Sequence, residues 1–439
     1  MPIQSAVRVC HMSDLHYSGK NLAESEACFA HTVALAIAGH AECVVVSGDS
    51  TDHALDAHSP AFVALARNIR QLADHCPVLM LQGTFSHEPP GTLSVLRLLG
   101  GRYPVFVADR IQQVALMPDG TWNESEGWRF ENLPAGARLL LSCIPTVNKA
   151  SVAAVVGATQ AAEAVGEQMA NLLAGYAPAH RAARAAGIAT AVVSHGTVSG
   201  CTTEHGVPMA GLDHEFTTGS LFAADASAVM LGHIHRHQAW QQDGRMIAYA
   251  GSIGRLHYGE EGDKGMLVWD VGADGADAVL ELTPARRTIE LRFAGAPDME
   301  ELRAIASDAQ GAFVKVCWEI SEEDRASIDR DAIEAALVGA AEVKMEGRII
   351  PVVRSRADGI SRAATLDEKL VRWAEVAGVV CAPLRDALGD LTIETPETIA
   401  AAILSTTTFA SDVDVPIEMT ELHGQTLPHE ETETLDLFA

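Results

Sequence analysis

The stretch 230–235 places two histidines directly after an apolar run. Residues 228–231 have the pattern of a buried strand, and Gly232 ends it. His233 and His235 follow at a spacing of two, and on an extended backbone such residues point to the same side. Neutral imidazoles are common ligands of divalent transition metals, so both side chains are candidate ligands beyond the strand end. Taken alone, this short motif more often marks a loop with two solvated histidines.

Aspartate and histidine side chains follow the other predicted strands as well. The apolar runs at 7–12, 43–46, 77–81 and 189–193 each lead into a short polar stretch. In open α/β sheets, ligands bind beyond the carboxyl ends of the strands, so we expect these side chains to converge there. The candidate residues are Asp14, His16, Asp49, His87, His195, His233 and His235.

Carboxylates mixed with imidazoles favour particular metals and a particular chemistry. Such ligand sets suit manganese, iron or zinc, whereas magnesium and calcium prefer shells made only of oxygen. The set is larger than one ion needs, and two ions roughly 3.5–4 Å apart, bridged by a shared carboxylate, would use it. Such a pair activates water near neutral pH and neutralises charge on a phosphoryl group. The residues therefore predict two-metal hydrolysis of a phosphate ester.

The composition is that of an ordinary globular protein. Of its residues, 48% are hydrophobic and 20% are charged. The length of 439 residues is enough for about two or three domains. No apolar run reaches the ~18 residues of a spanning helix, and no secretory signal is visible at the N-terminus. The eight cysteines are scattered without a Cys-x-x-Cys pair, which favours reduced thiols. We expect a cytoplasmic protein.

The formal net charge of −27 argues against a protein that coats nucleic acid by bulk electrostatics. Binding of phosphates depends on Lys and Arg, which release counterions. An enzyme acting on nucleic acid would need a local basic track, or a partner that holds the polymer.

Strands and helices alternate through the first part of the chain, which predicts a layered α/β sheet. Helices are expected at about 22–39, 59–75 and 150–186, and the strand at 265–271 is expected to close the sheet. After Pro284 the pattern changes to that of a small α+β domain. Its predicted elements are a strand at 288–293, a helix at 298–308, a strand at 313–319, a helix at 330–339 and a strand at 342–346.

The C-terminal part combines a helical segment with an acidic tail. Residues 364–404 are predicted to be helical, with apolar residues at alternating spacings of four and three. These residues are Leu366, Leu370, Trp373, Ala377, Val380 and Leu384. They could face a partner helix, or pack on their own domain, and Pro383 limits the length of the seam. From Ser411 onward the chain is acidic without Lys or Arg, which predicts a disordered tail.

The ordered motifs resemble those of the calcineurin-like metallophosphoesterases. They are Asp14-x-His16, Gly48-Asp49-x-x-Asp52, a Gly-to-His-Glu loop at 83–88, His195 and Gly232-His233-x-His235. Their order and spacing agree over roughly residues 7–271. The resemblance implies a layered β-sandwich flanked by helices.

The segment after the last motif resembles the corresponding segment of SbcD-type DNA repair nucleases. It runs from Tyr249 to Arg255 and continues from Gly259 to Gly265. This resemblance implies a nuclease domain at 1–284, a capping domain at 285–355, a partner-binding helical segment at 356–405 and an acidic tail at 406–439. It also implies DNA and an SMC-like ATPase as partners, a homodimer within the complex, and two divalent ions, most simply Mn²⁺.

The same resemblance implies a role for each candidate residue. Asp14, His16 and His235 would hold the first ion, His195 and His233 the second, and Asp49 would bridge them. His87 matches the family histidine that stabilises the transition state or assists departure of the leaving oxygen.

One ligand position departs from the family pattern. The family usually has Asn directly before the catalytic histidine, and here Ser86 stands there in a loop two residues longer. Ser86, Thr84 or a water could take its place, and a weaker donor predicts a second ion that binds less tightly. Asp52 and His53 lie where some relatives have a histidine that helps to set DNA geometry, and neither receives a role.

Two other functions fit the sequence. A phosphatase or phosphodiesterase acting on a small phosphate ester would suit the acidic charge. A scaffold subunit that has lost catalysis would suit the altered loop at Ser86, although the other ligand positions are filled.

Overall fold

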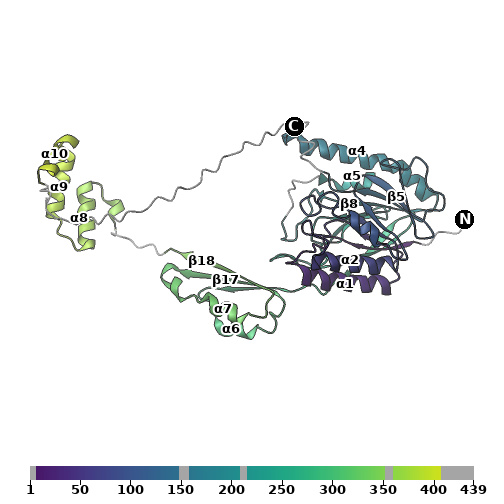
Figure 1. Ribbon diagram of the computed structural model, residues 1–439. Helices are drawn as coiled ribbons and strands as arrows, with labels where there is room; N and C mark the ends of the chain where they lie inside the picture. The colour runs from purple at the N-terminus through teal and green to yellow at the C-terminus, as the bar shows by residue number, and fades with distance from the viewer. Residues whose placement is uncertain (1–5, 148–157, 208–214, 352–358, 407–439) are drawn as a thin grey trace, which may run out of the picture. The chain divides into compact units, whose positions relative to one another are not determined.

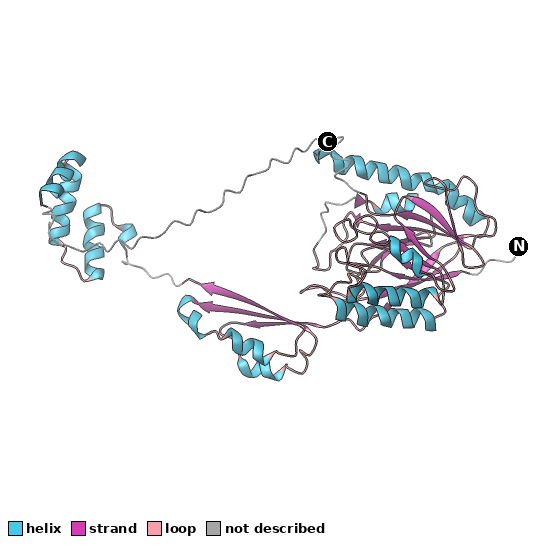
Figure 2. Ribbon diagram, viewed as in Figure 1, coloured by secondary structure: helices cyan, strands magenta, loops and turns pink. Residues whose placement is uncertain are grey.

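Two β-sheets and the helices on their outer faces make up most of the first compact unit. The computed structural model describes residues 6–147, 158–207, 215–351 and 359–406, and the chain divides into the units Met1–Pro351 and Val352–Ala439. In Figure 1 the helices α1 and α2 lie on one side of the strands, and α4 and α5 on the other. Figure 2 shows the same layers by type of secondary structure.

The first sheet has six strands in the order β15-β14-β1-β2-β3-β4. Strands β1 to β4 are parallel, and β14 and β15 are antiparallel additions beside β1. Its elements are β1 (Val7–Met12), α1 (Leu22–Ala38), β2 (Cys43–Val46), α2 (Pro60–Ala73), β3 (Val78–Leu81), η1 (Ser94–Leu99), β4 (Val105–Ala108), β14 (Gly265–Val271) and β15 (Ala276–Leu282). Helix α2 begins where the sequence signals it, because the Ser59 side chain accepts a hydrogen bond from the Phe62 N–H and proline follows at the first position.

The second sheet has seven strands in the order β12-β13-β11-β8-β7-β5-β6. Its four central strands, β13, β11, β8 and β7, are parallel. Its elements are β5 (Gln112–Leu116), β6 (Trp122–Glu124), β7 (Leu139–Ile144), α4 (Ala158–Ala185), β8 (Ala189–His195), α5 (Thr218–Ala223), β11 (Ala228–Gly232), β12 (Gln238–Gln242) and β13 (Arg245–Tyr249). A short pair, β9 (Thr197–Val198) and β10 (Glu215–Phe216), lies apart from it.

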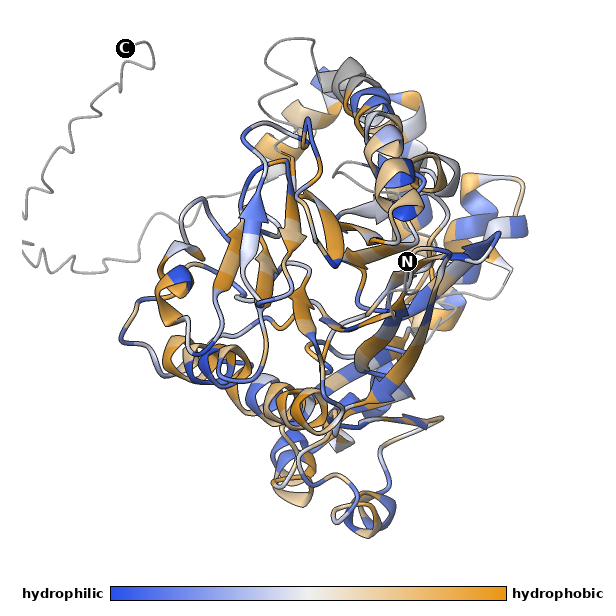
Figure 3. Cartoon of the chain, turned by 90° about the vertical axis from the view of Figure 1, so that its right-hand side faces the viewer, coloured by the Kyte–Doolittle hydropathy of each residue, from blue (hydrophilic) through white to orange (hydrophobic). Residues whose placement is uncertain are grey.

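Alternation along each strand decides which layer a side chain joins. In β2, Val44 and Val46 pack with the helices α1 and α2, whereas Cys43 and Val45 pack between the two sheets. The outer face of the second sheet packs against α4 and α5 in the same way. Figure 3 shows the hydrophobic colour concentrated on these inner strands. Burial of one such valine contributes about 1.5–3 kcal/mol, so the layers are held mainly by apolar contact.

The predicted fold class is confirmed, with one correction. The sheets form a layered β-sandwich flanked by helices, as expected. The strand at 265–271 does not close its sheet, however, because β15 pairs with its free edge. The predicted helix at 150–186 is described only from Ala158 onward, and its first part lies outside the described residues.

A small three-stranded sheet follows β15. It contains β16 (Thr288–Phe293), β17 (Phe313–Ser321) and β18 (Glu342–Ile350), all parallel, with α6 (Met299–Ala304) and α7 (Arg330–Ala336) packed on one face. A 3₁₀ turn, η2 (Glu322–Ser327), follows β17. The order of elements matches the expected α+β pattern. The predicted domain boundaries at 284/285 and 355/356 stay predictions, since this sheet and the two larger ones fall within one compact unit.

The predicted helical character of 364–404 is confirmed, but the row of apolar residues from Leu366 to Leu384 does not run along one helix. The described residues of the second unit form a 3₁₀ turn, η3 (Ile360–Arg362), and three short helices. These are α8 (Leu366–Ala377), α9 (Ala382–Ile393) and α10 (Pro396–Thr406). Gly378 has the left-handed conformation that ends α8, and Pro383 lies in the first turn of α9. Val380 therefore lies in the connection between two helices and cannot extend the row of apolar residues on α8. The predicted acidic tail lies outside the described residues, except for Thr406.

In the described part of the chain, no helix combines the length and the apolar character needed to cross a membrane.

A buried histidine in the outer layer makes stability depend on pH. The His180 imidazole on α4 contacts the Ser142 hydroxyl at 2.8 Å and the Ala224 carbonyl at 2.7 Å. Burial lowers the pKa of His180 from 6.5 to about 4. The unfolded chain therefore takes up a proton near pH 6.5 while the folded chain does not, so this contribution to stability is present above pH 6.5 and is lost as the pH falls toward 4.

We expect His180→Gln to flatten the dependence of stability on pH between 6.5 and 4. The wild-type chain should lose up to about 1.4 kcal/mol per pH unit more than the variant across this window. Urea denaturation at a series of pH values measures both slopes. Equal slopes in the two proteins would contradict the assignment to His180.

Candidate metal centre

Left-handed backbone turns carry four of the predicted ligands. Among the described residues, seven non-glycine residues have positive φ, and Asp14, His16, Asp49 and His233 are four of them, with φ between 45° and 99°. Such conformations are uncommon and cost on the order of 1–3 kcal/mol each, so they persist where the surroundings enforce them. Here the turns direct side chains from neighbouring strand ends toward one another.

The loops after β1 and β2 are joined to each other by backbone hydrogen bonds. The Asp14 N–H donates to the Gly48 carbonyl at 3.1 Å, and the His16 N–H donates to the Asp49 carbonyl at 3.0 Å. Gly48 itself has φ 104°, and a Cβ there would overlap the His195 imidazole. Only glycine fits at this position, which brings the loop of β2 against the end of β8.

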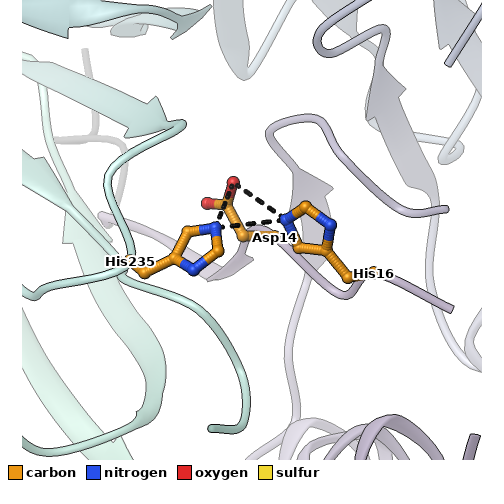
Figure 4. A group of neighbouring side chains, drawn as sticks. All are labelled: Asp14, His16 and His235. Atoms are coloured by element: carbon orange, nitrogen blue, oxygen red, sulfur yellow. Dashed lines mark hydrogen bonds and ion pairs between the residues drawn. The ribbon is translucent and has the colours of Figure 1, made fainter. Parts of the chain in front are cut away.

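Asp14, His16 and His235 form the first cluster of donor atoms (Figure 4). The Nε2 atoms of the two histidines are 3.1 Å apart, and the Asp14 Oδ1 lies 4.0 Å from His16 Nε2 and 3.8 Å from His235 Nε2. Metal–ligand bonds of about 2.1 Å let one ion join donors up to about 4.2 Å apart. All three pairs meet this limit. The His233 N–H donates to both oxygens of the Asp14 carboxylate, at 3.2 and 3.1 Å, and so helps to fix its orientation.

Carboxylates beside the Nδ1 atoms of His16 and His235 favour tautomers that suit a cation in this cluster. His16 Nδ1 lies 3.3 Å from a carboxylate oxygen of Asp52, and His235 Nδ1 lies 3.7 Å from one of Glu260. A carboxylate beside Nδ1 favours the proton on that nitrogen, which leaves a lone pair on Nε2. Two such lone pairs, beside the fully buried carboxylate of Asp14, are unfavourable unless a positive charge lies among them. The donor set therefore fits a divalent metal ion.

Asp49, His195 and His233 form the second cluster. His195 Nδ1 lies 2.8 Å from the Ser47 carbonyl, so it carries the proton, and Nε2 faces the Asp49 Oδ2 at 3.1 Å. Burial lowers the pKa of His195, but the neighbouring carboxylate of Asp49 outweighs it and raises the pKa to about 10. This pair binds positive charge strongly, and a metal ion can take the place of the second proton. The second cluster fits a metal as the first does.

The two histidines of the 233–235 stretch belong to different clusters. The extended-backbone argument, in which both point to the same side, is wrong, because His233 has φ 99°. His233 lies with Asp49 and His195, and its ring packs 5.2 Å from that of His195. His235 lies with Asp14 and His16.

A threonine hydroxyl, and not the predicted serine, lies in the second cluster. Thr84 Oγ1 is 3.1 Å from the Asp49 Oδ2 and 3.2 Å from His195 Nε2. Its N–H also donates to the Asp49 Oδ1 at 2.7 Å. Ser86 is exposed. The structure therefore places Thr84, the alternative considered for the longer loop, beside the second cluster.

Asp52, which received no role from the sequence, lies beside His16 and His87. Its Oδ1 lies 3.3 Å from His16 Nδ1 and 4.0 Å from His87 Nδ1, and these two nitrogens are 3.2 Å apart. His16, Asp52 and His87 thus form a third group, and His16 belongs to it as well as to the first cluster. Burial lowers the pKa of His87, so its imidazole is neutral at pH 7. The His53 side chain is more than half exposed, 3.9 Å from Asp52.

A buried glutamate that follows His87 joins two ligand loops. The Glu88 carboxylate accepts hydrogen bonds from the Ser50 N–H at 2.5 Å and the Gly83 N–H at 2.6 Å. Burial, together with the nearby charge of Asp49, raises the pKa of Glu88 to about 7. The sequence motif showed that Glu88 follows His87. It did not show that the Glu88 carboxylate contacts the loops after β2 and β3.

Comparisons with known proteins add little to this geometry. No family model matches the chain, and no curated protein matches it. Among solved structures, GAP50, the anchor in the inner membrane complex of Plasmodium, is 10% identical, with 64% of this chain and 85% of that one covered and a TM-score of 0.37. A dimetal phosphatase from Danio rerio is 9% identical, with 63% and 99% covered and a TM-score of 0.39. A predicted phosphoesterase from Streptococcus pneumoniae is 11% identical, with 64% and 94% covered and a TM-score of 0.24. At these scores we draw no argument from the likenesses.

Thr84 and Ser86 can be distinguished by metal titration. Thr84→Val keeps the shape of the side chain and removes its hydrogen bond to the Asp49 carboxylate, a contact worth about 1.5–3 kcal/mol. We expect the variant to bind one Mn²⁺ ion roughly tenfold or more less tightly and to bind the other with unchanged affinity. Isothermal titration calorimetry on metal-free protein gives both affinities. Ser86→Ala is the matched control, and weakening in that variant with none in Thr84→Val would contradict the placement.

Proposed function

We propose that this chain is a metal-dependent phosphoesterase of the calcineurin-like superfamily. The observation that supports it most is the convergence of two Asp/His clusters at the carboxyl ends of parallel strands from two sheets. The residues of both clusters are those of the ordered sequence motifs. Asp49, whose carboxylate lies in the second cluster, is the residue that would bridge to the first.

The residues of the chain divide the work of phosphoester hydrolysis among them. When bound, two divalent ions, most simply Mn²⁺, supply an activated water and neutralise the phosphoryl charge. His16 and His235 would present Nε2 to the first ion, with Asp52 and Glu260 beside their Nδ1 atoms at 3.3 and 3.7 Å. His87, with 31% of its side chain exposed, is the residue placed to hydrogen-bond a phosphoryl or leaving-group oxygen. We propose that Asp52 orients this imidazole.

Within this superfamily we propose the nuclease subunit of an SbcCD-like DNA repair complex. The proposal is supported by the sequence of the 249–265 segment, by the α+β element β16–β18 that follows it, and by the helices α8–α10. DNA, an SMC-like ATPase, a second copy of the chain and a cytoplasmic location belong to this proposal. Because the chain carries a net charge of −27, the partner would supply much of the grip on DNA.

A second candidate is a phosphodiesterase for small phosphate esters. The acidic charge favours it, since a small substrate needs no basic track. A scaffold without catalysis has less support, because both clusters of donors are complete in the structure.

A nuclease assay with His87→Ala tests the proposed function. We expect wild-type chain with Mn²⁺ to release nucleotides from end-labelled linear duplex DNA, and the variant to be slower by about 10²–10⁴-fold, the usual contribution of a proton-transferring side chain. The matched control is His31→Ala, an exposed histidine on α1, which should act as wild type.

The same assay distinguishes the alternatives. Hydrolysis of an aryl phosphodiester without any release from DNA, with or without the ATPase, would favour the small-substrate enzyme. Equal background rates in wild type and His87→Ala on both substrates would favour the scaffold.

A further inference from the structure

The segment after β13 packs closely on the main chain of His235. The carbonyl of His235 accepts hydrogen bonds from the Ser252 N–H at 3.2 Å and from the Lys264 ammonium at 2.8 Å. Gly251 has φ 81°, and a Cβ there would lie only 3.1 Å from the same carbonyl oxygen. The backbone of this metal-site histidine is therefore fixed by residues that follow it by 16 to 29 positions in the sequence.

The Lys264 ammonium is buried and lies close to three acceptor atoms. Its Nζ lies 2.5 Å from the Glu260 Oε2, 2.8 Å from the His235 carbonyl and 2.7 Å from the Ser252 hydroxyl. Three acceptors match the three N–H groups of an ammonium. A buried charge is tolerated when it is paired and hydrogen-bonded in this way. The side chains of Lys264 and Glu260 have no exposed surface, so the ammonium interacts with buried groups next to His235.

Glu260 completes the arrangement from the side of the imidazole. Its Oε1 accepts hydrogen bonds from the Leu256 N–H at 3.1 Å and the His257 N–H at 2.9 Å, and it lies 3.7 Å from His235 Nδ1. Through Oε2 the carboxylate pairs with the Lys264 ammonium, and through Oε1 it lies beside the imidazole of His235.

We propose that Glu260 and Lys264 are positioning residues that hold His235 in its metal-binding orientation. Lys264 holds the backbone carbonyl, and Glu260 favours the proton on Nδ1, so that Nε2 faces Asp14 and His16. Carboxylates that hold a ligating histidine in this way typically change metal affinity by 10–100-fold when they are removed. This inference rests on the metal centre proposed above and names two residues that act through one of its ligands.

The pair acts on one cluster only. His195, in the second cluster, has its Nδ1 held by the Ser47 carbonyl at 2.8 Å, which belongs to the loop after β2. Loss of the Glu260–Lys264 pair should therefore weaken one ion and leave the other unchanged. A merely structural role would lower the stability of the whole unit without this selectivity.

Metal titration of the full chain tests the proposal. Lys264→Met alone leaves a buried carboxylate without its partner, so the main variant is the double substitution Glu260→Gln/Lys264→Met, which is neutral and similar in volume. We expect one of two Mn²⁺ ions to bind 10–100-fold more weakly and the other to keep its wild-type affinity. Calorimetry gives the affinities, and circular dichroism shows whether the variant is folded.

Two further variants keep the test sharp. Ser252→Ala removes one acceptor of Lys264 and should weaken the same ion by a smaller factor, even if the double variant does not fold. Arg245→Met is the matched control, because it breaks a partly buried ion pair with Asp225 at 3.0 Å at the opposite end of β13. The control should lower the melting temperature and bind both ions as wild type does.

The outcomes separate the two proposals. Folded variants that bind both ions with wild-type affinity, or that weaken both equally, would overturn the positioning role. A wild-type chain that does not bind two ions would overturn the metal centre itself, whatever the variants do.

Discussion

Buried imidazoles and carboxylates that face one another are the feature on which the rest of the structure depends. His16 and His235 turn Nε2 toward each other at 3.1 Å, and Asp49 meets His195 at the same distance. Asp14 has no exposed surface. Groups of this kind cost several kcal/mol when they are buried without positive charge. The layers of the fold and the strained turns bring these atoms together. The carboxylates of Asp52 and Glu260, beside His16 and His235, help to hold them there.

The sandwich supplies rigidity, and the loops supply direction. The strands β1 and β2 of the first sheet and β8 and β11 of the second end near one another, because apolar side chains pack the two sheets face to face. Left-handed turns at Asp14, His16 and Asp49 then redirect the chain two to four residues after each strand end. Hydrogen bonds between loops, such as those of Glu88 and of the Lys264 ammonium, stabilise these strained turns against relaxation.

The sequence predicted the parts of this arrangement that depend on local pattern. Strand ends and ligand types could be read from apolar runs followed by Asp or His, since the carboxyl ends of parallel strands share one edge. The edge strand β15 was missed, because four of its seven side chains are exposed and two of these are acidic, which weakens the pattern of a buried strand. The seam from Leu366 to Leu384 is interrupted, because its apolar spacing continues through Gly378 although the helix ends there.

Contacts between distant segments could not be predicted from one sequence. The choice between Thr84 and Ser86 depends on the course of a loop two residues longer than usual, and the structure brings Thr84 to Asp49. The place of Asp52 beside both His16 and His87, and that of Glu260 beside His235, depends on packing between segments far apart in the chain. Spacing within a motif holds no information on such pairs, whereas residue type does show that each could accept a proton.

The most direct measurement is a crystal structure of the chain grown with Mn²⁺, with anomalous scattering recorded at the manganese edge. The account predicts two anomalous peaks about 3.5–4 Å apart, one among Asp14, His16 and His235 and the other among Asp49, His195 and His233. A map with no peak among these side chains, at full occupancy of Mn²⁺ elsewhere in the crystal, would contradict it.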